Sequence, residues 1–403
     1  MTKVAESFTG GTAQDTPARL ASLDALRGFD MFWITGGEII TAALIAIAGG
    51  YSASTGGSEK AQQAVMQQAL DSHPFAAAMA WQFKHAPWEG FRFEDLIFPM
   101  FVFIAGASLV YSLTKTLARE SRAVAARRVV SRMVLLFVIG VFFSGGFANG
   151  MEGVRWLGVL QRIALAYGGA GLLFLWFKPR GLVIACVSLL LGYWALLTFV
   201  PVPGFGAGDF KEGHNLTNYL DQQYLGGRKY DGNHDPEGML STLPAIASCL
   251  LGVFSGLWLR GTAPGGRKAL CLVVAGAVAL ALGWAWSPWF PVIKKLWTSS
   301  FVLVAAGWSA MLLGVFYWIV DVRGWARWVQ PWVWIGLNPI TIYILGSLID
   351  KRKLAARFTG GDLQLWLNGL QPGIGDLLTA LVAVGFTILL AWFLHRRRIY
   401  LRV

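Results

Sequence analysis

Residues 83–106 read FKHAPWEGFRFEDLIFPMFVFIAG. The second half of this stretch is an almost unbroken apolar run of the kind that crosses a bilayer as a helix. The first half gathers ionisable side chains just before that run, namely Lys84, His85, Glu89, Arg92, Glu94 and Asp95. The stretch therefore predicts a membrane helix with a polar mouth. That mouth is either a solvated loop or an active site at the membrane surface.

The composition extends this interpretation to the whole chain. Of the 403 residues, 55% are hydrophobic and 14% are charged, whereas an ordinary globular domain has about 25% charged residues. Only helices and closed barrels satisfy the backbone in lipid, and these runs are too long and too uniformly apolar for barrel strands. The net charge of +12 is no argument for nucleic acid, because the basic residues cluster between apolar runs. We expect an all-α polytopic membrane protein surrounded by lipid, with no nucleic-acid partner.

The apolar runs predict about ten transmembrane helices, with ends uncertain by a few residues. They cover residues 29–49, 95–114, 132–148, 159–177, 181–200, 241–259, 269–286, 298–320, 331–349 and 375–394.

Lysine and arginine predict the orientation. The connection after the second run contains Lys115, Arg119, Arg122, Arg127, Arg128 and Arg132, and the chain ends in HRRRIYLRV. An even number of helices puts these segments and both termini on one side, which the positive-inside rule makes the cytoplasm. We therefore expect a cytoplasmic tail (1–28), a transmembrane domain (29–394) and a basic cytoplasmic tail (395–403). The first 28 residues have no short apolar core, so we expect no cleaved signal peptide.

Three long connections, 50–94, 201–240 and 350–374, lie on the opposite side. Loops of this length are usually functional, and we expect the substrate site among them. The five histidines include no pair at the spacing of a helical metal site, and the loops contain no cysteine, so no metal site is expected.

His85 and Asp95 are the first candidates for chemistry. Asp95 begins a helix, where a carboxylate serves as an N-terminal cap. Alternatively, Asp95 or Glu94 holds one nitrogen of His85 and leaves the other free to take a proton. For His85 itself the alternatives are an interfacial polar residue and a catalytic base.

Several other polar residues allow two interpretations. Asp30 and Glu38 lie inside the first apolar run, where an unpaired carboxylate costs roughly 3 kcal/mol. They line a polar path or form internal ion pairs, for example with Arg162. Asp235 and Glu237 precede the sixth run and either cap it or bind an amine or hydroxyls. Trp88 belongs to an aromatic belt or stacks on a sugar.

The order of motifs resembles one family. In sequence come RLASLDALRG, FKHAPWEGFRFEDLIFPMFVFIAG, GVLQRIALAY, DPEGMLSTLPAIASCLLGVFSG, KKLWTSSFVLVAAGWSAMLLGVFYWIVDV and WVWIGLNPITIYI. From about residue 19 to residue 400, they are similar to the heparan-α-glucosaminide N-acetyltransferase family of transmembrane acyltransferases. The resemblance implies an enzyme that uses cytosolic acetyl-CoA to acetylate a glucosamine amine on the far side of the membrane.

The resemblance also implies a location and an assembly. The animal members add an N-terminal luminal domain and an extra helix, and this chain looks like the multi-pass members of the bacterial inner membrane. A homodimer is the expectation for the family. The acceptor is either a free sugar or the end of a polymer.

The resemblance implies roles for individual residues. Its active-site histidine falls on His85, as base or acetyl carrier, with Asp95 orienting the ring and Glu38 as a further catalytic candidate. For acetyl-CoA, the candidates that would bind the phosphates are the cytoplasmic Arg27, Arg128 and Arg132. The candidates that would line the path of the pantetheine arm are polar groups near or within the helices, namely Gln161, Arg162, Ser299 and Asn338. The arginines have topology as an equal explanation. The predicted sugar contacts are Trp88, Glu89, Asp235 and Glu237.

Two other functions compete with this interpretation. A transporter of an amino sugar such as N-acetylglucosamine would use Asp30 and Glu38 for proton coupling. A structural membrane scaffold would leave the polar residues at the helix mouths unexplained.

Overall fold

The computed structural model describes residues 20–50, 67–68 and 71–400. Within those residues the regular elements are helices, and the β-bridges are isolated pairs. In chain order the helices that overlap the predicted apolar runs are α2 (Ala21–Phe32), α3 (Glu38–Ala48), α6 (Phe93–Leu117), α7 (Arg122–Phe143), α8 (Val159–Trp176), α9 (Pro179–Phe199), α11 (Thr242–Arg260), α12 (Gly265–Trp286), α13 (Ser299–Tyr317), α14 (Gln330–Leu337), α15 (Pro339–Leu348) and α18 (Ile374–Arg396). Two π-helical turns, η1 (Trp33–Gly37) and η3 (Trp318–Val322), join α2 to α3 and follow α13.

Eight helices among the described residues are long and apolar enough to cross a membrane. The predicted all-α polytopic class is therefore confirmed. Two of the ten predicted segments fall outside these eight. The segment at 132–148 belongs to α7, which begins with several arginines and ends at Phe143. The segment at 331–349 is broken into α14 and α15 at Pro339, whose ring disfavours helical backbone at the preceding Asn338.

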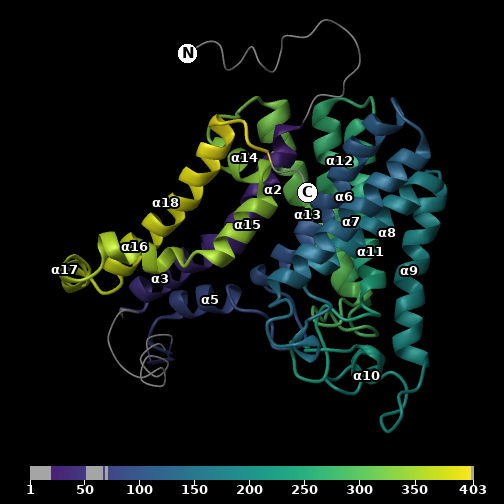
Figure 1. Ribbon diagram of the computed structural model, residues 1–403, viewed down its shortest axis with the longest axis horizontal. Helices are drawn as coiled ribbons and strands as arrows, with labels where there is room; N and C mark the ends of the chain where they lie inside the picture. Colours follow the sequence, from purple (N-terminus) through teal and green to yellow (C-terminus); the bar gives the residue numbers. More distant parts are fainter. Residues whose placement is uncertain (1–19, 51–66, 69–70, 401–403) are drawn as a thin grey trace, which may run out of the picture.

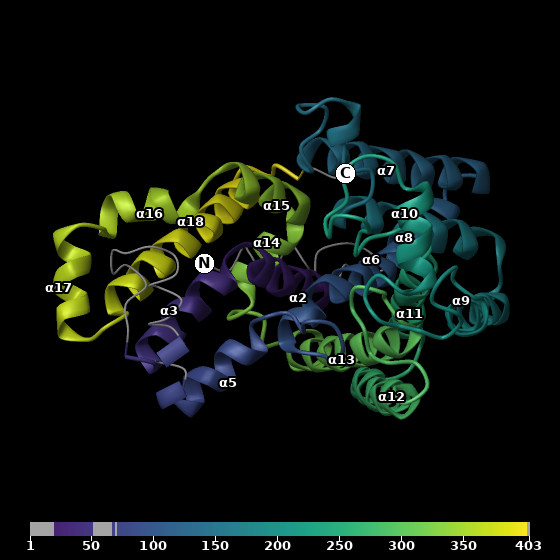
Figure 2. The same ribbon diagram turned by 90° about the horizontal axis from the view of Figure 1, so that it is seen from below.

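The long connections hold short helices that the sequence did not predict. They are α5 (Pro74–Gln82), α10 (Leu216–Tyr224), η2 (Met151–Gly153), α16 (Lys351–Thr359) and α17 (Asp362–Leu370). Figure 1 shows α6–α9 and α11–α13 as one bundle, with α3, α5 and α16–α18 as a second group beside it. Figure 2 shows the same division from below, with α2, α14 and α15 between the two groups.

Glycines allow a close crossing of two helices in the bundle, α6 and α11. A Cβ added at Gly106 of α6 would lie 1.9 Å from the carbonyl oxygen of Cys249, and one added at Gly252 of α11 would lie 1.9 Å from that of Phe103. Small residues let membrane helices approach in this way. The crossing fixes α6, which carries residues of both cavities described below.

The two described chain ends lie at the same end of the bundle. Leu20 and Tyr400 line one cavity together with Lys115, near the end of α6. Glu94, at the start of α6, is about 30 Å away at a rise of 1.5 Å per residue. The first helix begins at Ala21, so part of the predicted tail of residues 1–28 is helical, and residues 1–19 lie outside the described part.

The connection between α12 and α13 forms backbone contacts with the loop that carries His85. Phe290, Ile293 and Leu296 are fully buried in an apolar cluster of this region. Glu89 pairs with Ile293 as an isolated bridge, and the Gly90 N–H donates to the carbonyl of Val292 at 2.8 Å. These contacts bring the connection and the mouth of α6 together.

Candidate active site

His85 and Asp95 form a hydrogen-bonded pair at the mouth of α6. Nδ1 of His85 lies 3.0 Å from Oδ1 of Asp95. The Asp95 side chain is 0% exposed, whereas the His85 side chain is 59% exposed. An ionised carboxylate only accepts, so the pair requires a hydrogen on Nδ1 and leaves Nε2 as the basic nitrogen.

Asp95 is also held by the backbone. Its Oδ2 accepts the N–H of Ala86 at 3.1 Å and that of Arg92 at 3.2 Å. Arg92 is the residue before the first turn of α6, so the bond to its N–H is a helix-capping contact. The two sequence-based interpretations of Asp95, cap and histidine partner, therefore hold together.

Lys294 contacts both members of the His85–Asp95 pair. Its Nζ lies 3.0 Å from Nδ1 of His85 and 3.3 Å from Oδ1 of Asp95. Burial lowers the pKa of the Lys294 amine, and the nearby carboxylates of Asp95, Glu94 and Glu237 offset this only in part. The lysine is thus easier to deprotonate than one in water.

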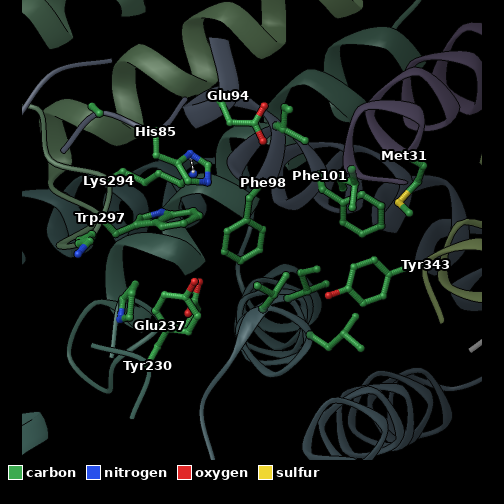
Figure 3. Close-up of a pocket in the computed structure, with 18 of the residues that line it drawn as sticks. Met31, His85, Glu94, Phe98, Phe101, Tyr230, Glu237, Lys294, Trp297 and Tyr343 are labelled. Atoms are coloured by element: carbon green, nitrogen blue, oxygen red, sulfur yellow. Dashed lines mark hydrogen bonds between the residues drawn. The ribbon is translucent and has the colours of Figure 1, made fainter. Parts of the chain in front are cut away.

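His85 opens into a cavity of about 370 Å³. Figure 3 shows His85 and Lys294 on one wall and Glu237 and Tyr230 on the opposite wall. Its remaining lining is largely apolar and comes from α2, α6, α8, α15 and the connections, with Met31, Phe98, Phe101, Ile163, Trp297 and Tyr343 among the residues. A mainly apolar cavity of this size with a few converging polar groups is typical of a small-ligand site.

An arginine organises the wall opposite His85. Arg155 bonds Asp235 at 2.7 Å and Glu237 at 2.6 Å. Burial alone would raise the pKa of Asp235, but its bonds to Arg155 outweigh burial and lower it. In Glu237 burial dominates and the pKa is raised, although Arg162 and Arg155 oppose the rise. Glu237 and Arg155 line the cavity, and Asp235 lies behind them.

A second cavity of about 570 Å³ lies at the other end of α6. Five basic side chains line it: Arg27, Lys115, Arg119, Arg128 and Arg132. Arg27 donates to Ser108, and Arg128 donates to Glu120 at 2.6 Å. The Arg132 guanidinium lies over the ring of Tyr167 at 4.8 Å. The positive charge suits an anionic ligand such as a phosphate ester.

The two cavities meet inside the bundle. Four residues line both of them: Phe101, Ile163, Pro339 and Ile340. Along α6, Glu94 and Phe98 line the first cavity, Ser108 and Lys115 line the second, and Phe101 lies between. The broken helix contributes Pro339 and Ile340 to this shared wall. The two cavities are therefore neighbours, with this shared wall between the basic cavity and the cavity at His85.

Residues 69–263 match the family model for the catalytic part of heparan-alpha-glucosaminide N-acetyltransferase. A human heparan-alpha-glucosaminide N-acetyltransferase is 30% identical over 381 residues, which cover 80% of this chain and 56% of the human protein. Over most of its length the chain is similar to the heparan-α-glucosaminide N-acetyltransferase family. The mouse protein of the same name is 28% identical and is covered to 57%, so the chain spans about half the length of these curated relatives.

The family's matched region includes His85, Asp95, Arg155 and Glu237 and ends before Lys294. Among the predicted site residues, the cavity at His85 is lined by His85, Trp88 and Glu237, and the basic cavity by Arg27, Arg128 and Arg132. The structure thus gathers six of the predicted residues around two neighbouring cavities.

Four residues predicted for the pantetheine path are buried in the packing and line neither cavity. Gln161 donates to the carbonyl of Arg155 at 3.3 Å, and Ser299 donates to that of Leu190 at 2.7 Å. Asn338 donates to the carbonyl of Ile399 at 3.0 Å. Arg162 donates to the carbonyl of Gly238 at 3.2 Å and lies over the ring of Trp297.

Asp30 and Glu38, which were predicted to line a polar path, lie outside both cavities. Asp30 is 0% exposed, and neither of its oxygens has a hydrogen-bond partner within the described part of the chain. Glu38, at the start of α3, and Glu89 are both exposed. None of the three lines either cavity, and the suggested pairing of Asp30 with Arg162 is not formed.

The sequence did not single out Lys294, Arg155 or Tyr230. Lys294 lies in the KKLWTSS block that carries part of the family resemblance, but the block was interpreted as a whole. Arg155 precedes Trp156 in a short connection with no charge pattern of its own. Both residues reach the site through contacts more than 75 positions away in the chain, which spacing does not reveal.

Glu212, Asp231 and His234 form a group at metal-ligand distances. Nζ of Lys295 lies 3.0 Å from Glu212 and 2.9 Å from Asp231. Burial lowers the pKa of Lys295, but these carboxylates outweigh burial and raise it. The lysine supplies the positive charge that a metal ion would bring. The absence of a resident metal stays a prediction.

Proposed function

We propose that this chain is a membrane acetyltransferase that transfers the acetyl group of acetyl-CoA to the amine of a glucosamine-type sugar. The observation that carries the proposal is the pair of neighbouring cavities toward opposite ends of α6, which share four lining residues. One is basic, and the other presents a histidine held by a buried aspartate. The names of the matched relatives support the same chemistry.

The basic cavity is the site we assign to acetyl-CoA. Arg27, Arg128 and Arg132 face it with Lys115 and Arg119, and guanidinium groups bind phosphates in bidentate fashion. The uncharged pantetheine arm would pass the shared wall of Phe101, Ile163, Pro339 and Ile340. That passage brings the thioester from the phosphate end toward His85.

His85 is the residue we assign to proton transfer. A sugar amine is nucleophilic only without its extra proton, so a base must take that proton. With Nδ1–H bonded to Asp95, Nε2 accepts the proton while the amine nitrogen forms a bond to the thioester carbonyl. The carbon–sulfur bond then breaks, and the CoA thiolate takes up the second proton that the nitrogen loses as it becomes an amide, so CoA leaves as the free thiol.

A covalent route uses the same atoms. Nε2 would attack the thioester first, release CoA and hold the acetyl group until the amine takes it. An acetyl group trapped on His85 with acetyl-CoA alone supports this route. A strict need for both substrates before CoA release excludes it.

The sugar is assigned to the wall opposite His85. Glu237 and Arg155 offer an acceptor and donors for hydroxyls and amine, and Trp88 offers an aromatic face. Trp88 is fixed by donating its indole N–H to the carbonyl of Phe210 at 3.0 Å. This arrangement fits a polar ring bound at an otherwise apolar cavity.

We infer a bacterial inner membrane as the location, with the basic cavity and both chain ends in the cytoplasm. The basic residues that line that cavity are those the positive-inside rule assigns to the cytoplasmic face. His85 would then work at the periplasmic face. Acetyl groups would cross the membrane without CoA crossing it.

Release of free thiol from acetyl-CoA by the purified full-length protein tests the function. Wild type should release thiol in step with N-acetylglucosamine formation when glucosamine is present, and His85→Gln should not. Full activity in His85→Gln would refute the role of His85. Transport of labelled sugar without acetyl-CoA, and with no thiol release, would show the transporter instead.

A further inference from the structure

Lys294 and Asp95 compete for one atom of His85. Nδ1 of His85 lies 3.0 Å from the Asp95 oxygen and 3.0 Å from the Lys294 amine, and these two lie 3.3 Å apart. Figure 3 shows the Lys294 side chain directed at the imidazole of His85. Lys294 belongs to the connection between α12 and α13. Three polar atoms thus share one corner of the cavity, with a single position for a hydrogen on Nδ1.

The charge of Lys294 decides where that hydrogen can lie. A carboxylate only accepts, so the bond to Asp95 needs Nδ1–H and leaves Nε2 bare. An ammonium only donates, so a bond from charged Lys294 to Nδ1 needs a bare Nδ1 and puts the hydrogen on Nε2. The two bonds therefore select opposite tautomers of the neutral ring.

We propose that Lys294 is a positioning residue that selects the tautomer of His85, which presents a basic Nε2 to the cavity only while Lys294 is a neutral amine. This inference rests on the proposed use of Nε2 in acetyl transfer. Deprotonation of Lys294 removes the ammonium that requires a bare Nδ1, so Nδ1–H can donate to Asp95. Protonation of Lys294 turns Nε2 into a donor and stops it from accepting a proton.

The surroundings of Lys294 favour such a switch. The charged groups facing it are Asp95 and Glu94 of α6, His85, and Glu237 of the connection before α11. Burial lowers its pKa despite those carboxylates. Asp95 cannot turn away, because its Oδ2 is held by two backbone N–H groups.

Two neighbours provide matched controls. Lys295 is adjacent in the chain, but its amine bonds Glu212 and Asp231. His214 forms the same kind of pair, with Nδ1 2.9 Å from Asp209, and the described residues place no lysine amine on its ring. His214 is therefore an internal standard for a histidine–aspartate pair without a lysine.

Diethyl pyrocarbonate, which acylates a bare imidazole nitrogen, measures the tautomer without relying on catalysis. The full-length protein in lipid nanodiscs is treated briefly between pH 6 and 9.5, and peptide mass spectrometry gives the ratio of modified His85 to modified His214. In wild type the ratio should rise about tenfold as Lys294 loses its proton, since each unit of pH changes a proton equilibrium tenfold. Lys294→Met should show the high ratio throughout. Lys294→Arg, whose charge is permanent, should show the low ratio throughout.

Equal ratios in wild type, Lys294→Met and Lys294→Arg at every pH would overturn the proposal, as would a flat profile in wild type. Lys295→Met should follow the wild-type profile. If Lys294→Met fails to fold, the wild-type profile and Lys294→Arg still decide. Acetyl transfer retained by His85→Gln would refute the proposed function without changing these ratios, so the two failures are distinguishable.

Discussion

Two histidine–aspartate pairs in this chain have nearly the same geometry and different surroundings. His85 lies 3.0 Å from Asp95, and His214 lies 2.9 Å from Asp209. Asp95 is 0% exposed and anchored by backbone N–H groups, whereas the Asp209 side chain is 27% exposed. The bond length alone therefore does not separate a catalytic pair from a loop contact.

The difference lies in what each imidazole faces. His85 lines a cavity and shares its Nδ1 with Lys294. The ring of His214 stacks on Phe205 with centroids 4.1 Å apart and lines neither cavity. A histidine becomes a useful base where a fixed partner sets its tautomer and a substrate can reach its other nitrogen. The first pair meets both conditions.

The largest expected effect separates the two histidines. His85→Gln should lower acetyl transfer by about 100- to 10,000-fold, the usual range for loss of a general base. His214→Gln should leave the rate near wild type. The measurement is N-acetylglucosamine formation at saturating acetyl-CoA, and equal losses in both variants would erase the contrast.

The two aspartates should differ next. Asp95→Asn offers Nδ1 an amide that can donate to it, which favours the wrong tautomer and should lower kcat by about 100- to 10,000-fold. Asp209→Asn should leave kcat unchanged. Because asparagine caps a helix about as well as aspartate does, the Asp95→Asn variant should keep the capping contact of α6. Thermal unfolding of the same samples shows whether the kinetic loss exceeds the unfolded fraction.

Glu237 tests whether the wall facing His85 holds the acceptor. Glu237→Gln should raise the KM for glucosamine about tenfold, worth about 1.4 kcal/mol, with a smaller change in kcat. Burial raises the pKa of Glu237, so wild type should lose acceptor affinity on acidification at a higher pH than an exposed glutamate would. The variant should lack that step. A KM profile identical to wild type contradicts the assignment.

The smallest effect concerns the loop pair. The Lys211 N–H and then His214 lower the pKa of Asp209, so its contribution to stability is present above the unfolded-state pKa and is lost as the pH falls. Because the pair is exposed, solvent screening limits that contribution, and Asp209→Asn should change stability by less than about 0.5 kcal/mol. Chemical denaturation at pH 7 and pH 3 measures it, and a larger loss would give this pair a structural role.

Much of the fold was predictable because lipid leaves the backbone few choices. Apolar runs located the helices, and basic residues grouped Lys115 and Arg128 with the chain ends. The sequence shows a proline at position 339, but it does not show what the helix break there does to the structure. The break places Pro339 and Ile340 in the wall between the two cavities, with Phe101 of α6 and Ile163 of α8, and that depends on how distant segments come together.

The site was predictable only where a motif carried it. His85, Asp95 and Glu237 followed from their blocks, whereas Lys294 and Arg155 enter through contacts between distant segments. Some polar residues inside apolar runs were predicted to line the pantetheine path, but they line neither cavity. Gln161, Ser299 and Asn338 bond to backbone carbonyls within the packing, which sequence patterns do not distinguish from lining a path.

Acetyl transfer across a sealed bilayer tests the central claim most directly. The protein is reconstituted into liposomes loaded with glucosamine, and acetyl-CoA is added outside, where it reaches the fraction of molecules whose basic cavity faces outward. The account predicts N-acetylglucosamine inside the liposomes, CoA thiol outside, and neither product with His85→Gln. Product formed only when both substrates are on the same side, or undiminished with His85→Gln, would contradict it.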